Sequence, residues 1–360
     1  MAVAALVALA AAYLPSDAGS VNGTTIGQST LNADLSAIAG SAGFQCYLYA
    51  DQELNGGTTT GMFPVEGVSE TSSASVATAT KNPGSINAGF ARYWLSQLLT
   101  NQLVVQLLAQ LHLTVTPADL AFGRTTLSGQ MTAALDEFES ESGDSCGTAA
   151  TILASLPAGF RAEQVQVQAN QDVLFAHEAG YSLGTAGLHR YFTAHQVKFE
   201  TICYDLAPFA SESEATAARA TLATGTSFTK FATASSSCAV RLGLPSSVAS
   251  LAVGKVSSPV ALSGGEYGLV QITGVKHTSF TVVKVDVEDA VLEAGEARAS
   301  ALVRAASRRA VVTADPRYGR VVPRTTDLLP PLSPPAGSVL NPAVNLPAVS
   351  TGGGSGSSGA

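Results

Sequence analysis

Large apolar residues recur every three or four positions along much of the first two hundred residues, the spacing of one face of an α-helix. The longest such run is 90–113, where Trp94, Leu98 and Leu108 keep this spacing, and we expect it to form a central buried helix. Thr116 before Pro117 predicts the start of another helix. The remaining helices of this half are expected to begin at Ser29 and to cover 148–156, 162–178 and 185–197.

The apolar pattern changes after residue 199. Residues 199–206 alternate in the way of a half-buried strand, 212–223 and 228–234 read as helices, and 266–275 alternates again. In this last strand Tyr267 and Leu269 should face one side, and Gly268 and Val270 the other. Residues 282–287 add a strand-like run, and 289–310 return to helix. The fold class predicted is α+β, a mainly helical domain with a small inserted α+β domain.

The two ends of the chain have unusual compositions. Residues 1–14 are almost wholly Ala, Val and Leu, and small residues follow, so a signal-like apolar segment is expected over 1–20; the alternative is a natural apolar N-terminus. In either case this segment could bring the protein near a membrane. Residues 325–360 are rich in Pro, Gly and Ser and should remain disordered.

Charge and cysteine content narrow the classes of function. Only 13% of residues are charged and the net charge is −8, which argues against nucleic acid as a partner. The cysteines are four and lack CxxC spacing, so we expect no metal site and no cofactor. Three disulfide connectivities are open. Cys46 with Cys146 and Cys203 with Cys238 are favoured because each pair then lies within one domain, and isolated buried thiols are the alternative.

Three passages resemble a parvulin-type peptidyl-prolyl isomerase module. They are Gly225-Thr226-Ser227-Phe228 with Ala232, the stretch 251–260, and Tyr267-Gly268-Leu269-Val270-Gln271-Ile272. The order of parts resembles the bacterial extracytoplasmic folding factors of the SurA and PrsA type. This resemblance implies a helical domain over 21–196 completed by 280–324, a parvulin-like domain over 197–279, and an extracytoplasmic location.

The resemblance also implies where catalysis would occur. The family places a His on the first strand, an Asp or Cys after the second helix and a His on the last strand, around a proline pocket of Met and Phe. Here Cys203 comes near the first position, Cys238 near the second and Gly268 at the third, with Tyr267 beside it. The candidates for the proline-binding surface are Leu244, Val248 and Phe228.

Three functions fit these residues. The first is a folding factor that binds unfolded or proline-containing secreted polypeptides, with isomerase activity weak or lost; whether it is an enzyme stays open. The second is a working isomerase that uses Cys238, the neighbouring serines and Tyr267. The third is a structural or docking protein of the cell envelope.

Two clusters of residues allow both a functional and a purely structural interpretation. The aromatic residues Phe90, Tyr93, Trp94 and Phe122 could line a groove for unfolded chains, but their helical spacing favours a core position. The arginines near the C-terminus could form a patch for an acidic partner. We expect instead a solvated helix face, on which they pair with Glu293 and Glu296.

Overall fold

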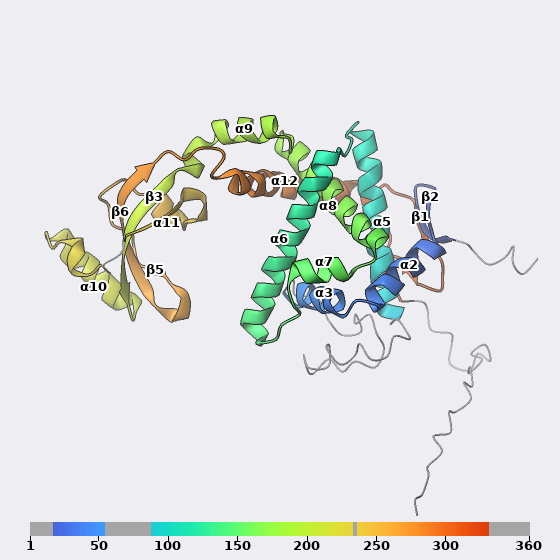
Figure 1. Cartoon of the computed structure of the whole chain (residues 1–360), viewed down its shortest axis with the longest axis horizontal. Coiled ribbons are helices and arrows are strands. Elements are labelled where there is room, and N and C mark those ends of the chain that lie inside the picture. Colours follow the sequence, from blue (N-terminus) through green and yellow to red (C-terminus); the bar gives the residue numbers. More distant parts are fainter. Residues whose placement is uncertain (1–16, 55–87, 233–235, 331–360) are drawn as a thin grey trace, which may run out of the picture.

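The computed structural model describes residues 17–54, 88–232 and 236–330. Figure 1 shows a helical unit and a smaller sheet unit, joined where the chain leaves α9 and where it returns before α12. The predicted α+β class is confirmed. The apolar run 1–14 and nearly all of the predicted tail lie outside the described residues.

The helical unit is built from long helices whose ends follow local sequence signals. Thr116 and Thr148 each make a capping box, and Gly143 and Gly180 end their helices in the left-handed conformation. The bounds are α2 (Gln28–Ala39), α3 (Ala42–Leu54), α5 (Ala88–Gln110), α6 (Pro117–Ser142), α7 (Ala149–Ser155), α8 (Ala158–Ala179), α9 (Thr185–Ala194) and α12 (Lys284–Ser307).

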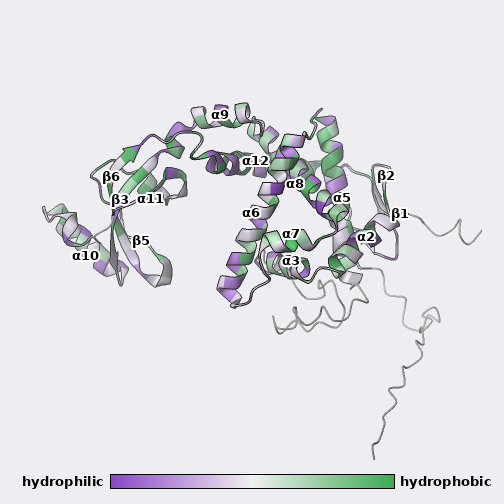
Figure 2. Cartoon of the chain, viewed as in Figure 1, coloured by the Kyte–Doolittle hydropathy of each residue, from purple (hydrophilic) through white to green (hydrophobic). Residues whose placement is uncertain are grey.

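Helix α5 lies at the centre of the helical unit, as its apolar pattern predicts. Leu95 and Leu99 are fully buried, and Leu103 and Leu107 continue the same stripe at intervals of four. Val105, which the sequence pattern places on the buried face, is 43% exposed. Figure 2 shows both hydrophobic and hydrophilic residues along the long helices, and the buried stripe of α5 is the side that its neighbours cover.

A small antiparallel sheet lies at the edge of the helical unit. Its strands β1 (Asp17–Val21), β2 (Thr24–Gly27) and β7 (Val312–Ala314) lie in the order β2-β1-β7. Asn22 and Gly23 have positive φ in the turn between β1 and β2, as a tight hairpin requires. Gln106 of α5 donates from its side chain to the Val21 carbonyl at 2.9 Å, and so holds this hairpin.

This sheet corrects two predicted boundaries. Residues 17–20 of the predicted signal-like segment form most of β1, which pairs with β2 on one side and, through Gly19 and Ser20, with β7 on the other, so they belong to the folded unit. At the other end, β8 (Arg320–Val321) pairs with β9 (Leu328–Leu329), and Thr326 shares a 2.7 Å hydrogen bond with Thr100. The folded chain therefore extends past 325, into the region predicted to be disordered.

The sheet unit contains four antiparallel strands in the order β4-β3-β6-β5. Helix α10 and the short helix η2 pack on one face of the sheet, and α11 packs on the other. The bounds are η1 (Gln196–Phe199), β3 (Thr201–Phe209), α10 (Glu212–Ala223), η2 (Phe228–Lys230), β4 (Ser237–Val240), η3 (Arg241–Gly243), α11 (Ser246–Ala249), β5 (Val260–Ala261), η4 (Ser263–Gly265) and β6 (Tyr267–Lys276).

Two details at the junction of the units differ from the sequence prediction. Phe199 is fully buried in the core of the helical unit rather than at the start of a strand, and β3 begins at Thr201. The predicted strand 282–287 is instead the beginning of α12, because Val283, Val287 and Val291 recur at intervals of four and all are fully buried.

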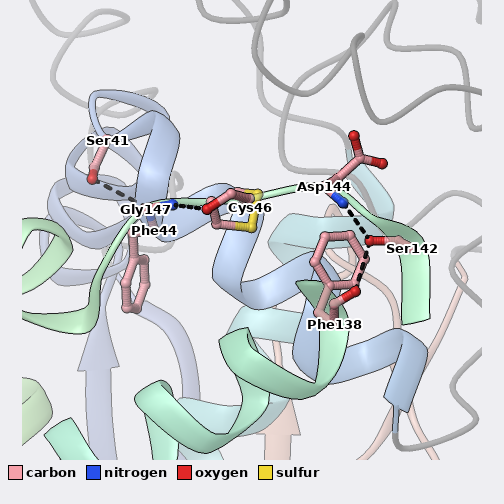
Figure 3. The surroundings of a disulfide bond; sticks show 9 residues. Ser41, Phe44, Cys46, Phe138, Ser142, Asp144 and Gly147 are labelled. Atoms are coloured by element: carbon pink, nitrogen blue, oxygen red, sulfur yellow. Dashed lines mark hydrogen bonds between the residues drawn. A yellow bond between two sulfur atoms is a disulfide. The ribbon is translucent and has the colours of Figure 1, made fainter. Parts of the chain in front are cut away.

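Both disulfides predicted from the sequence are formed. Cys46 of α3 bonds to Cys146, which precedes α7, and Cys203 of β3 bonds to Cys238 of β4. Figure 3 shows the first bond beside the end of α6, where the Ser142 hydroxyl donates to the Phe138 carbonyl and accepts from the Asp144 amide. This bond ties the N-terminal helix pair to the segment between α6 and α7.

Helix α8 crosses both α6 and α12 at glycine contacts. A Cβ added at Gly295 of α12 would overlap the Phe175 carbonyl of α8, and one added at Gly123 of α6 would lie 2.8 Å from the Ala169 amide nitrogen. These contacts bring three helices together around the concave surface described below.

Candidate functional site

Gly268 lies at the position where the parvulin resemblance expects the last-strand histidine. On the neighbouring strand β3, Pro208 is directly opposite Gly268, and Leu206 is opposite Val270. Residues directly opposite in an antiparallel pair project to the same face of the sheet. Gly268 therefore faces the side that carries Leu206, Val270 and α11.

Apolar carbon fills the space beside Gly268. A Cβ at position 268 would lie 2.7 Å from Cδ1 of Leu206 and 3.2 Å from Cδ1 of Leu262. Such distances leave no room for a larger side chain unless both leucines move. Two leucines therefore occupy the space beside Gly268, and they offer no polar group to a twisted amide.

Cys203 and Cys238 lie away from this position. Cys203 is opposite Cys238 on one side and opposite Gly274 on the other, so it is six positions along β6 from Gly268. Their sulfur atoms are bonded to each other, and a disulfide sulfur is neither a thiolate nor a proton donor.

Tyr267 and Phe228 belong to the opposite face of the sheet. Tyr267 packs against the cluster that contains Phe228 and Leu269, on the side covered by α10. Because neighbouring residues of a strand point to opposite faces, Tyr267 cannot share a site with the surface at Gly268. The polar groups near this face are Ser236 and Asp205, whose side chains are hydrogen-bonded to each other.

Leu244 and Val248 pack with Leu206 and Val270 in the apolar cluster under α11. Val248 is only 1% exposed, so it supports the core more than it offers surface to a ligand. The six candidate site residues therefore lie in three separate groups. These are Cys203 with Cys238, Tyr267 with Phe228, and Leu244 with Val248.

Sequence reasoning missed Leu206 and Leu262, which decide the chemistry at Gly268, and Ser257. The fully buried Ser257 donates its amide to the Val270 carbonyl at 2.8 Å, and its hydroxyl accepts from the Val270 amide at 3.0 Å. Through these bonds the stretch 251–260 is held along β6. The alternation of apolar residues in 201–209 would have identified Leu206 if the register with β6 had been known.

A second candidate site is a cavity of about 500 Å³ bounded by α6, α8 and α12, which we call the α6–α8–α12 groove. Phe122, Phe175 and Leu292 give it apolar walls. Val285, at the start of α12, also lines it and is 64% exposed. A cavity of this volume with apolar walls has the dimensions of a ligand site.

Carboxyl groups also line this groove. Burial raises the pKa of Asp172 to about 6, although a hydrogen bond from Gln168 acts in the opposite direction. Partial burial, together with the charges of Asp286 and Glu288, raises the pKa of Asp289. Loss of hydration disfavours the charged form of an acid, and a neighbouring negative charge does the same.

Of the predicted aromatic groove, only Phe122 lies in this cavity. Phe90 and Trp94 are buried in the core of the helical unit, and Tyr93 packs against the same core. In the part of the chain that the structure describes, no group of three potential metal ligands occurs. No helix there is both long enough and apolar enough to cross a bilayer.

A pair of carboxyl groups joins α2 to α8 elsewhere in the helical unit. Asp34 is 3% exposed and accepts a 3.1 Å hydrogen bond from the Trp94 indole nitrogen. Burial, followed by the charge of Asp34 and a hydrogen bond with it, raises the pKa of Glu163 to about 7. Burial also raises the pKa of Asp34, so the pair favours retaining a proton near neutral pH.

This pair makes stability depend on pH. The folded protein holds the Glu163 proton more tightly than the unfolded chain does, whose pKa is near 4.5. The resulting contribution to stability is fully present below pH 4.5 and is lost as the pH rises through about 7. Glu163→Gln should reduce this dependence and stabilise the protein at pH 8 by on the order of 1–3 kcal/mol relative to the native residue. Urea unfolding at pH 5 and pH 8 measures it, with Glu178→Gln on the same helix as the control. Equal pH dependence in Glu163→Gln and the native protein would contradict the assignment.

Comparison with known proteins finds similarity only among solved structures. No protein-family model matches the chain, and no curated protein matches its sequence. Among solved structures, the peptidylprolyl isomerase PrsA from Bacillus cereus is 11% identical with a TM-score of 0.32, over 64% of this chain and 90% of that one. The foldase PrsA from Lactococcus lactis is 12% identical with a TM-score of 0.32, over 83% and 94%.

A SurA-like chaperone from Campylobacter jejuni is 12% identical with a TM-score of 0.25, over 83% of this chain and 99% of that one. The fold is similar to that of PrsA and SurA-like proteins. These are the folding factors that the sequence resembles. At such identities and TM-scores, the roles of individual residues rest on the geometry of this chain alone.

Proposed function

We propose that this protein is an extracytoplasmic folding factor that holds unfolded polypeptide in its helical unit, and that its sheet unit does not catalyse prolyl isomerisation. The observation that carries the holding function is the α6–α8–α12 groove, an apolar-walled cavity of about 500 Å³ to which three helices contribute. A surface of this kind suits apolar side chains that a folded partner would keep buried.

The sheet unit supports the second half of the proposal. It keeps four antiparallel strands with helices on both faces, yet Leu206 and Leu262 occupy the space at Gly268. Acceleration of X-Pro rotation requires groups that stabilise the twisted amide more than the planar one. Two leucines and a disulfide provide none of these groups, so the sheet unit serves as a scaffold or an additional contact surface for the client.

The disulfides support the proposed location. The two disulfides join cysteines that are 100 and 35 positions apart in the sequence. Such bonds are expected in an oxidising compartment, since reducing conditions would break them. Export would then depend on the apolar segment that precedes the described residues, and bacterial secreted polypeptides would be the clients.

A light-scattering assay of a chemically denatured client tests the holding function. Stoichiometric native protein should suppress aggregation, and Phe122→Ala combined with Val285→Ser should weaken this suppression several-fold, because apolar contact area is lost. Val311→Ser is the matched control, since Val311 is 68% exposed and lies outside the groove. Absence of suppression by the native protein would contradict the proposal and favour a structural or docking role in the cell envelope.

A further inference from the structure

The α6–α8–α12 groove has a one-sided charge distribution. Five carboxylates line it, and none of its lining residues is Lys, Arg or His. They are Asp172, Glu288, Asp289, Glu293 and Glu296. Lys284 pairs with Glu288, which leaves Asp172 and three carboxylates of α12 to set the charge of the groove.

The ion pairs predicted for α12 are not formed within the described residues. Arg298 donates instead from Nε to the Glu178 carbonyl at 2.7 Å. The four ion pairs of the described chain include neither Glu293 nor Glu296. Both carboxylates therefore remain exposed on the groove side of α12 and can meet a cation from outside the chain.

Asp172 gives the strongest indication that the groove binds a hydrogen-bond donor from another molecule. It is fully buried, its Oδ1 accepts a 2.8 Å hydrogen bond from Gln168, and the Thr126 side chain also interacts with its carboxylate, but no donor lies within hydrogen-bond distance of Oδ2. A buried carboxylate that uses only part of its hydrogen-bonding capacity is costly for the folded state. Because Asp172 lines the groove, a donor placed there would satisfy the free oxygen.

The dimensions and walls of the groove define the kind of donor. A volume of about 500 Å³ is far larger than a metal ion needs, and the described residues offer no group of three metal ligands. Phe122 and Phe175 provide aromatic walls, against which the methylene stem of a long cationic side chain can pack. An ammonium or guanidinium group on an apolar body matches both features.

We propose that the α6–α8–α12 groove selects basic, apolar segments of unfolded polypeptides, with a Lys or Arg side chain that donates to Asp172 and apolar neighbours against Phe122 and Phe175. This inference rests on the proposed function and names its client class. The exposed carboxylates Glu293 and Glu296 attract the segment electrostatically, so this part of the interaction weakens with salt. The contact with Asp172 is shielded from solvent and depends less on ionic strength.

Three fluorescent peptides of equal length test the selection by anisotropy with the full-length protein. They share the same Leu and Phe positions and carry Lys, Ser or Glu between them. The Lys peptide should bind roughly tenfold more tightly than the Ser peptide, and the Glu peptide more weakly than both. Asp172→Asn should reduce affinity for the Lys peptide roughly tenfold and leave the Ser peptide unchanged.

Glu293→Gln combined with Glu296→Gln alters only exposed side chains, so it tests the charge of the groove without risk to the core. It should weaken the Lys peptide several-fold at low salt. Glu137→Gln on α6, an exposed position outside the groove, is the control and should change nothing. The inference would be overturned if the native protein bound the three peptides equally. It would also be overturned if Asp172→Asn and the Glu293→Gln, Glu296→Gln variant both bound the Lys peptide as tightly as the native protein. Displacement of the Lys peptide by an equimolar free polyamine would overturn it as well.

These outcomes are distinguishable from failure of the proposed function. If the native protein suppresses client aggregation but binds the three peptides equally, holding stands and charge selection fails. If the Lys peptide binds selectively but aggregation is not suppressed, the groove is a site for basic segments and the holding function fails.

Discussion

Replacing Cys46 and Cys146 together by serine is expected to lower the free energy of unfolding of the helical unit by about 4 kcal/mol, since a cross-link over roughly 100 residues strongly restricts the unfolded chain. The two cysteines are 100 positions apart, and their bond joins α3 to the segment before α7 (Figure 3). Urea unfolding of the native protein and the double variant, followed by circular dichroism, measures the loss.

Cys203→Ser combined with Cys238→Ser is the companion variant. This bond spans 35 positions within two paired strands, so its removal should cost less and should affect mainly the sheet unit. A loss below about 1 kcal/mol for the Cys46–Cys146 variant would show that packing alone holds α3 in place, contrary to our interpretation of the bond.

Gly268→His is expected to destabilise the sheet unit by about 1–3 kcal/mol and to give no prolyl isomerase activity. The added side chain would collide with Leu206 and Leu262, and all four cysteines are disulfide-bonded, so no free thiol completes a polar site. Thermal unfolding and the isomerisation rate of a short X-Pro peptide measure the two effects.

Gly274→His provides a control on the same strand, because a Cβ at that position would meet nothing within 4 Å. The stability of the Gly274→His variant should remain close to that of the native protein. Adding Leu206→Ala to Gly268→His should recover part of the lost stability by making room. Native stability of Gly268→His alone, or measurable isomerase activity in it, would contradict the packing described at this site.

Much of the helical unit could be predicted from the sequence because its signals are local. The cap at Thr116 and the apolar stripe of α5 depend on residues within a few turns of each other. The sheet β2-β1-β7 could not be predicted in this way, since β1 pairs with β7 almost three hundred residues later. The short strand β7 has no alternation long enough to be recognised.

The candidate site depended on strand register, which the sequence does not specify. The pairing of β3 with β6 shifts between Cys203 and Tyr204, where β6 carries one extra residue, and sequence alternation alone does not reveal such a shift. The contact of Leu206 with position 268 follows only once this register is known. The α6–α8–α12 groove could not be predicted from the sequence either, because its walls come from three separate helices that meet at Gly123 and Gly295.

The central claim is that this protein holds unfolded polypeptide without catalysing prolyl isomerisation. Refolding of an aggregation-prone client whose slow phase is limited by an X-Pro bond tests both parts in one measurement. We predict a higher yield of native client with an unchanged rate of the slow phase when the disulfides are formed, and the same unchanged rate after their reduction. Acceleration of that phase by catalytic amounts of the protein, or an unchanged yield at stoichiometric amounts, would contradict the account.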